Sequence, residues 1–272
     1  MRIILAVLVG LMLTACAPPK ADVRRDARTA AIQIQKLSYR HGDTVMQGYL
    51  AFDPAQKFPR PGVLVIHEWY GLNDYAQRRA RELAALGYVA LAADMYGDGK
   101  VAADRKEAGA LAGALRQDRA LMRARARAGL AALRALPQTD PQRLGAMGYC
   151  FGGGVALELA RSGADLRGVI SFHGNLDTPN PTDANNIRGS VLVLHGAADP
   201  HVSPEQVAAF EKEMSVAGVD WEMVSYGGAV HAFTNPESGG NPATGAAYDA
   251  KADRRSWDAM RRFFDEILGT NK

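Results

Sequence analysis

Cysteine is scarce in this chain, which has 272 residues and only two cysteines, Cys16 and Cys150. The sequence also has no cluster of metal-ligating residues, no glycine-rich loop of the kind that cradles phosphate, and no internal repeat. Each of these patterns would indicate a class of cofactor site or a repeat architecture. Their absence leads us to expect that the protein uses no cofactor and no metal.

Excess charge is also small, since 32 basic and 29 acidic residues give a net charge of +3. Most of the basic excess lies between Arg116 and Arg134, where arginines alternate with alanine and leucine. A nucleic-acid-binding helix is one interpretation, but the leucines form an amphipathic stripe with the arginines outside it. Aromatic residues for base stacking are lacking there. We therefore interpret the segment as a solvated helix face and expect no nucleic-acid partner.

Long apolar runs are missing, and the one at the N-terminus, Ile3 to Met12, is too short to span a membrane permanently. It follows Arg2 and precedes Leu13-Thr14-Ala15-Cys16, which resembles a bacterial lipobox. We expect a lipoprotein signal peptide over residues 1–15, lipidation of Cys16 and a polar tether over residues 16–36. The alternative is a plain secretory signal cut after Ala15. The expected location is the bacterial cell envelope, with the lipid anchor in the outer membrane facing the periplasm.

With Cys16 used as the anchor, Cys150 has no disulfide partner in a compartment where disulfides are usual. It lies in Gly148-Tyr-Cys150-Phe-Gly152, between a short apolar run and a helical pattern. This is the G-x-S-x-G nucleophile elbow with sulfur in place of the hydroxyl. At the start of a helix, free N–H groups and the helix dipole favour a thiolate. The alternative is a buried, inert cysteine in a glycine-rich turn.

Two possible partners of Cys150 follow in the chain. Asp199 comes just after the apolar strand pattern 190–195, and His231 follows the alternating pattern 220–226. The order nucleophile, acid, histidine is that of the α/β hydrolases, and spacings of 49 and 32 residues leave room for one strand and one helix each. Taken singly, Asp199 could be a turn residue before Pro200, and His231 an ordinary loop histidine. Their joint occurrence in this order indicates a Cys-His-Asp triad.

Upstream, the buried-type strand 63–67 is followed at once by Glu68 and Trp69. In this fold the loop after that strand supplies one oxyanion donor, and the residue after the nucleophile supplies the other. The expected donors are therefore the backbone N–H groups of Trp69 and Phe151. Glu68 is harder to interpret, because a carboxylate beside a thiolate would blunt it unless the carboxylate is protonated or moves away. A solvated loop glutamate is the alternative.

Five motifs carry a resemblance to a known family: His67-Glu68-x-x-Gly71-Leu72, Asp94-Met-Tyr96-Gly97, Gly148-Tyr-Cys150-Phe-Gly-Gly153, His195-Gly-x-x-Asp199 and His231-Ala-Phe233-x-Asn235-Pro236. Together they resemble the dienelactone hydrolase family over nearly all of the chain from about Ser38 to Ile267. The resemblance implies an α/β-hydrolase fold and a triad of Cys150, His231 and Asp199. It also implies that Glu68 contacts the cysteine at rest and keeps it unreactive until substrate displaces the carboxylate.

One departure from the family concerns its substrate. Dienelactone hydrolases proper hold the substrate's carboxylate with two arginines, one just after the Asp-x-Tyr loop and one four residues after the catalytic histidine. Here those places read Gly97-Asp98 and Asn235. The resemblance therefore implies the family's chemistry more firmly than its named substrate, and we expect substrates without a carboxylate or with one held by another group.

The expected fold is a mostly parallel sheet of about eight strands with helices on both faces, as strand–helix alternation implies. A hairpin about Gly42-Asp43 precedes it, and residues 37–272 form one domain without an internal boundary. The expected strands lie near 63–67, 88–93, 144–149, 167–172, 190–195 and 220–226, and the helices near 75–86, 104–136, 151–162, 204–217 and 246–268.

The expected function is hydrolysis of small esters or lactones through a thioester at Cys150. The alternatives are acyl transfer or peptide hydrolysis by the same triad, and a non-catalytic envelope lipoprotein on a hydrolase fold. The oligomeric state is not determined by the sequence, and a monomer is expected.

Overall fold

The computed structural model describes residues 31–269, so the expected signal peptide, the lipidation site Cys16 and most of the tether lie outside the described residues. The strands are β1 (Gln33–His41), β2 (Thr44–Phe52), β3 (Arg60–Ile66), β4 (Val89–Ala93), β5 (Thr139–Tyr149), β6 (Gly168–Phe172), β7 (Ser190–Gly196) and β8 (Trp221–Tyr226). The helices are α2 (Asp74–Ala85), α3 (Arg105–Gln117), α4 (Arg119–Arg134), α5 (Phe151–Arg161), α6 (Pro204–Val216) and α7 (Ala250–Leu268), with short 3-10 turns η1 (Pro181–Asn186), η2 (Pro236–Ser238) and η3 (Pro242–Thr244).

All eight strands form one sheet in the order β1-β2-β4-β3-β5-β6-β7-β8. The hairpin β1–β2 is antiparallel and joins β4 in the antiparallel sense, and the strands from β4 to β8 run parallel. The carboxyl ends of six parallel strands therefore meet at one edge of the sheet, where open α/β sheets build their sites. The predicted mostly parallel sheet is confirmed.

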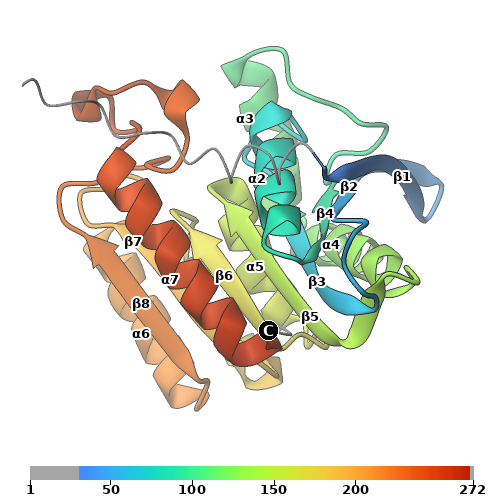
Figure 1. The fold of residues 1–272 in the computed structure, drawn as a ribbon. Helices are drawn as coiled ribbons and strands as arrows, with labels where there is room; N and C mark the ends of the chain where they lie inside the picture. The colour runs from blue at the N-terminus through green and yellow to red at the C-terminus, as the bar shows by residue number, and fades with distance from the viewer. Residues whose placement is uncertain (1–30, 270–272) are drawn as a thin grey trace, which may run out of the picture.

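Helices cover both faces of the sheet (Figure 1). Side chains of α4, α5 and α6 pack into one apolar core, and those of α2 and α7 pack into the other, on the opposite face. Every residue of β3, β4 and β6 is buried, as expected for strands covered on both sides. The loops at the carboxyl edge thus extend from strands that are covered on both faces.

Several boundaries differ from the expectation. Strand β5 begins at Thr139 rather than near residue 144, and α7 begins at Ala250 rather than near residue 246. Strand β1 begins at Gln33, which pairs with Phe52, so residues 33–36 belong to the sheet although we expected them in the tether. The single helix expected over 104–136 is two helices, α3 and α4. Asp118 ends the first and caps the second, because its side chain accepts a hydrogen bond from the Leu121 N–H.

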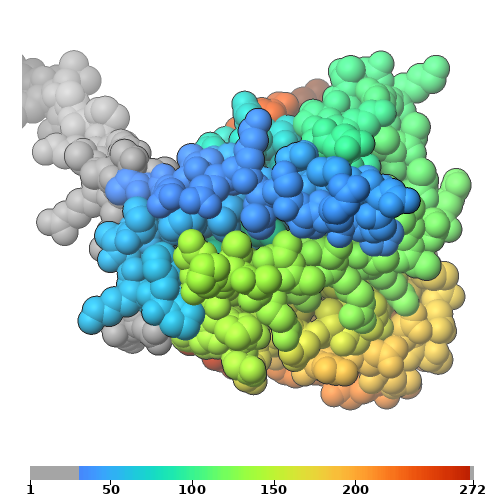
Figure 2. Space-filling model, turned by 90° about the vertical axis from the view of Figure 1, so that its right-hand side faces the viewer, coloured from blue at the N-terminus to red at the C-terminus, as the bar shows by residue number. Residues whose placement is uncertain are grey.

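The hairpin β1–β2 lies along the outside of the molecule and forms an edge of the sheet (Figure 2). Most of β1 is exposed, whereas β2 buries Met46, Leu50 and Phe52. Within residues 31–269, no helix combines the length and the apolar character needed to cross a bilayer.

Candidate active site

Cys150 is the single residue between β5 and α5, and its backbone is strained, with φ 54° and ψ −118°. Its N–H donates to the Phe172 carbonyl at 3.0 Å, and its carbonyl accepts from the Gly153 N–H at 3.0 Å. A Cβ on Gly148 would overlap the Gly152 carbonyl, and one on Gly152 would lie 2.6 Å from the His67 carbonyl oxygen. Only glycine fits at either flank, so the local sequence is that of a tight strand–helix elbow.

Asp199 and His231 follow the carboxyl ends of β7 and β8, and both are buried. The Nδ1–H of His231 donates to Asp199 Oδ2 at 2.8 Å. Two backbone hydrogen bonds hold His231 in its loop. The His231 N–H donates to the Gly245 carbonyl, and the His231 carbonyl accepts from the Ala247 N–H. Because Asp199 occupies Nδ1, the other ring nitrogen is the one available to Cys150.

The environment of His231 favours its charged form. Burial lowers its pKa, but the charge of Cys150 and hydrogen bonds to Asp199 and to the Cys150 side chain raise the pKa more, so that it lies above the ordinary value. A cationic imidazole beside the sulfur stabilises a thiolate there. His231 is thus hydrogen-bonded to Asp199, and it lies near enough to Cys150 for the charge of the sulfur to raise its pKa.

The backbone N–H groups of Trp69 and Phe151 are the two expected oxyanion donors, and each lacks a hydrogen-bond acceptor in the described part of the chain. Within residues 31–269, neither the Trp69 N–H nor the Phe151 N–H donates a hydrogen bond to another group of the protein. Phe151 is the first residue of α5, where N–H groups have no partner inside the helix. Unpaired amides at the two positions expected for oxyanion donors are what such a site requires.

The loop that carries Trp69 is fixed by two buried side chains. The ring of His67 accepts from the Met95 N–H at 3.2 Å through Nε2, so Nδ1 carries the proton that it donates to the Glu68 carbonyl at 2.5 Å. Tyr96 donates its hydroxyl hydrogen to the Trp69 carbonyl at 2.6 Å. These two bonds orient the peptide units on either side of Trp69, and the first of these units contains the Trp69 N–H.

Glu68 is buried, and its carboxylate accepts a hydrogen bond from Asn235 Nδ2 at 2.7 Å. Burial raises its pKa, while the Asn235 bond and the charge of His231 lower it by less, so the pKa lies above the ordinary value. Within residues 31–269 the Glu68 carboxylate makes no hydrogen bond to Cys150, and the contact that the family resemblance implies stays a prediction. Asn235, which stands four residues after His231 where we expected no arginine, is therefore bonded to Glu68.

Two arginines of α2, Arg79 and Arg81, have hydrogen-bond partners within the protein. Arg79 is buried and donates to the Thr234 carbonyl at 2.8 Å, to Asp253 at 2.5 Å and to Glu82 at 2.9 Å. Arg81 donates to the Tyr49 hydroxyl at 2.8 Å. Both guanidinium groups are thus committed to contacts within the protein.

One residue that the sequence did not single out lies against the nucleophile. His173 follows the end of β6, and its Nδ1 accepts from the Cys150 N–H at 3.2 Å. Its ring packs edge-on against that of His231, with centroids 5.4 Å apart. The sequence could have indicated His173 by its position directly after a buried strand, which is the feature that identified Asp199.

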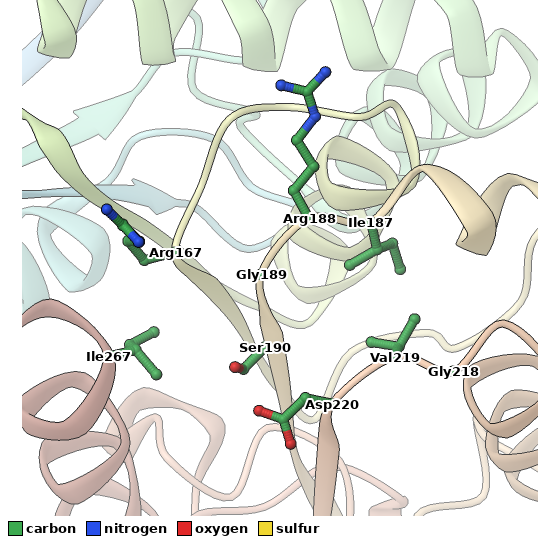
Figure 3. Close-up of a pocket in the computed structure, with 9 residues that line it drawn as sticks. All are labelled: Arg167, Ile187, Arg188, Gly189, Ser190, Gly218, Val219, Asp220 and Ile267. Atoms are coloured by element: carbon green, nitrogen blue, oxygen red, sulfur yellow. The ribbon is translucent and has the colours of Figure 1, made fainter.

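One hollow lies at the opposite end of the sheet, at the amino ends of β6, β7 and β8 (Figure 3). It has a volume of about 460 Å³ and is bordered by Arg167, Arg188 and Asp220, none of them near Cys150. Across residues 31–269, no three His, Cys, Asp or Glu side chains form a group that could hold a metal ion. Cys150, Asp199 and His231 instead follow the carboxyl ends of β5, β7 and β8.

A strained nucleophile elbow after β5, with an acid after β7 and a histidine after β8, defines an α/β hydrolase. The chain belongs to the dienelactone hydrolase family, whose model matches residues 46–268. This membership makes the protein an enzyme of the carboxylic ester and lactone hydrolase class.

Relatives and solved structures agree with that assignment. A dienelactone hydrolase-like promiscuous phosphotriesterase from metagenomic libraries is 45% identical, with a TM-score of 0.85 over 88% of this chain and 100% of the other. A Saccharolobus solfataricus protein provisionally named a carboxymethylenebutenolidase is 28% identical over 254 residues, which are 80% of this chain and 93% of the relative. The dienelactone hydrolase of Anabaena variabilis, at 20% identity, a TM-score of 0.66 and coverage of 88% and 99%, shares the fold.

Proposed function

We propose that the protein hydrolyses small neutral esters or lactones by covalent catalysis at Cys150. The proposal is carried by the strained elbow at Cys150, the hydrogen bond between His231 and Asp199, and the two unpaired amides of Trp69 and Phe151. The charge of Cys150 also raises the pKa of His231. Nucleophile, base, orienting acid and oxyanion donors are the complete set that acyl transfer to a thiol requires.

The proposed reaction has two halves. The Cys150 thiolate adds to the ester carbonyl, and the amides of Trp69 and Phe151 hold the resulting oxyanion. The C–O bond breaks, His231 gives its proton to the departing alkoxide, and a thioester remains on Cys150. His231 then takes a proton from water, the hydroxide adds to the thioester, and the C–S bond breaks to release the acid and the thiolate. Asp199 keeps the imidazole in the required orientation.

Glu68 supports a control step in this proposal. Its buried carboxyl group bonds to Asn235 and feels the charge of His231, so its protonation state affects the field around the ion pair of Cys150 and His231. Because its pKa is raised, a proton can be held there at a pH where an exposed glutamate has lost it. We infer that Glu68 regulates the thiolate through this field.

The experiment is a screen of p-nitrophenyl esters and unsaturated lactones with wild-type protein and the Cys150→Ala variant. We expect turnover by the wild type and none above background in the variant, with both proteins giving the same circular dichroism spectrum. Adding alcohol, amine and peptide acceptors to the same assay separates hydrolysis from acyl transfer and peptidase activity. Turnover of peptides alone would contradict the proposal.

A second candidate activity is hydrolysis of phosphotriesters. It is favoured by the 45% identity to a structure described as a promiscuous phosphotriesterase. The same thiolate would attack phosphorus, the aryloxide would leave with a proton from His231, and water would release the diester from Cys150. Paraoxon turnover that is lost in Cys150→Ala supports this activity, and turnover that persists in the variant contradicts it.

For the N-terminal part of the chain, we propose lipidation at Cys16 and attachment to the outer membrane on its periplasmic side. The support is the lipobox-like sequence that ends a short apolar region. Several acyl chains on one residue would provide the hydrocarbon that stable anchoring needs. A mature N-terminus at Cys16 carrying lipid, seen by mass spectrometry and lost in Cys16→Ser, is the expected result. A mature N-terminus elsewhere contradicts it.

A further inference from the structure

The Cys150 amide is held by a buried chain of side chains that the proposed mechanism does not use. The Cys150 N–H is shared between the Phe172 carbonyl at 3.0 Å and His173 Nδ1 at 3.2 Å. On the other side of the ring, His173 Nε2 lies 2.7 Å from Thr234 Oγ1. Thr234 Oγ1 lies 2.6 Å from the Tyr75 hydroxyl, which in turn accepts from Arg79 Nε at 3.3 Å.

The geometry fixes the tautomer of His173. An N–H donor, Cys150, points at Nδ1, so Nδ1 has no proton and the neutral ring carries its hydrogen on Nε2. That hydrogen is donated to Thr234 Oγ1. Burial lowers the pKa of His173 well below the ordinary value, and the charge of His231 lowers it further. A second proton on Nδ1 would also break the bond to Cys150.

The ring of His173 lies between the nucleophile elbow and the loop that carries His231. It contacts the rings of His231, Phe233 and Tyr149, with centroids 5.4, 5.0 and 6.0 Å away. Thr234 belongs to the same loop as His231, and its carbonyl is held by Arg79. The ring of His173 therefore joins the nucleophile elbow to the histidine loop.

Backbone strain makes such an anchor necessary. Cys150 has φ 54° and His173 has φ 39°, so both residues leave their strands in the left-handed region. A non-glycine residue stays there only when its surroundings hold it. If the Cys150 amide were released, the backbone could relax and move the sulfur away from His231.

We propose that His173 is a positioning residue that holds Cys150 in its strained conformation, accepting from the Cys150 N–H at Nδ1 and donating from Nε2 to Thr234. Its two hydrogen bonds set the distance between the elbow and the loop of His231. The role rests on the proposed thiol chemistry, because it concerns the placement of the sulfur. It adds an anchoring histidine, distinct from the histidine that moves the proton.

Two substitutions separate the two bonds of the ring. In His173→Asn, Oδ1 takes the place of Nδ1 and can accept from the Cys150 N–H, and asparagine tolerates a positive φ. In His173→Gln, the amide reaches toward Thr234 but leaves the Cys150 N–H without its side-chain acceptor. We expect the rate of Cys150 alkylation by iodoacetamide to fall about tenfold to a hundredfold in the His173→Gln variant. In the His173→Asn variant the rate should stay within about fivefold of the wild-type rate.

A second pair leaves residue 173 unchanged. Thr234→Val removes the acceptor for Nε2, and Thr234→Ser keeps it. We expect Val to slow alkylation by about threefold to tenfold and Ser to restore it. His41→Gln is the control, because His41 ends the edge strand β1, which β2, β4 and β3 separate from β5, and we expect a change of less than about threefold. If His173→Gln does not fold, the Thr234 pair decides.

Alkylation requires no substrate, so the result is independent of whether esters are hydrolysed. Equal alkylation rates in Asn and Gln variants with equal melting temperatures would overturn the role of His173. So would a Val variant as fast as Ser. The expected pattern without any ester turnover would support the anchor and overturn the proposed function.

Discussion

Removing the amide of Asn235 tests how the buried carboxylate of Glu68 is stabilised. In Asn235→Ala the carboxylate loses a buried hydrogen bond of 2.7 Å, and the Glu237 N–H loses its acceptor at 3.0 Å. A bond to a charged group contributes about 1.5–3 kcal/mol and a neutral one about 0.5–1.5 kcal/mol. The free energy of unfolding should therefore fall by about 2–4 kcal/mol, or roughly 4–16 °C in Tm for a domain of this size.

The loss should depend on pH. The Asn235 bond lowers the pKa of Glu68, so removing it raises the pKa of the folded protein further above the unfolded value. A raised pKa contributes stability that is present at low pH and lost as the pH rises through the folded pKa. The deficit of the variant should thus be smallest near about pH 4 and largest near about pH 8.

Urea denaturation of wild type and Asn235→Ala at both pH values measures this deficit. The Glu68→Gln background is the control, because there the same substitution removes no charged partner and its cost should not change with pH. A deficit that is equal at the two pH values, or smaller than about 0.5 kcal/mol, would refute an ionisable Glu68 held by Asn235.

Three further predictions concern the site. Gly152→Ala places a Cβ against the backbone carbonyls of Ile66 and His67, so the free energy of unfolding should fall by about 1–3 kcal/mol or more. The control is Gly113→Ala in α3, where a Cβ has nothing within 4 Å, and it should raise the free energy of unfolding by up to about 1 kcal/mol. Equal shifts in Tm for the two variants would contradict this prediction. In Cys150→Ala the pKa of His231, followed by proton NMR, should fall, because the charge of the sulfur no longer raises it; an unchanged titration would contradict the ion pair. A neutral ester should exceed its carboxylate analogue in kcat/KM by about tenfold or more, and Asn235→Arg should reduce that ratio; a wild-type preference for the anion would show that another cation takes the missing arginines' place.

The sheet could be predicted from the sequence because its inner strands are continuous apolar runs bounded by loops. The division between α3 and α4 was not evident, since buried side chains of both helices belong to the same apolar core and the apolar pattern continues across the break. Only Asp118, which caps α4, marks the boundary, and an aspartate is equally common on a solvated helix face.

In the site, residues with a motif or a strand-end position could be predicted, and residues that act through distant contacts could not. The elbow and the order of Asp199 and His231 are local signals. The partners of His173 are not local, since Thr234 lies 61 residues away, and Thr234 meets Tyr75 across 159 residues. The bond between Glu68 and Asn235 spans 167 residues and follows only from the folded structure.

The central claim is that Cys150 forms a covalent acyl intermediate. Wild-type protein mixed with p-nitrophenyl acetate, quenched in acid and digested, should give a peptide that contains Cys150 and is heavier by one acetyl group. Cys150→Ala should lack the adduct, and its turnover should fall on the order of a thousandfold or more. Turnover by Cys150→Ala near the wild-type rate, or an acetyl group on another residue during turnover, would contradict the account.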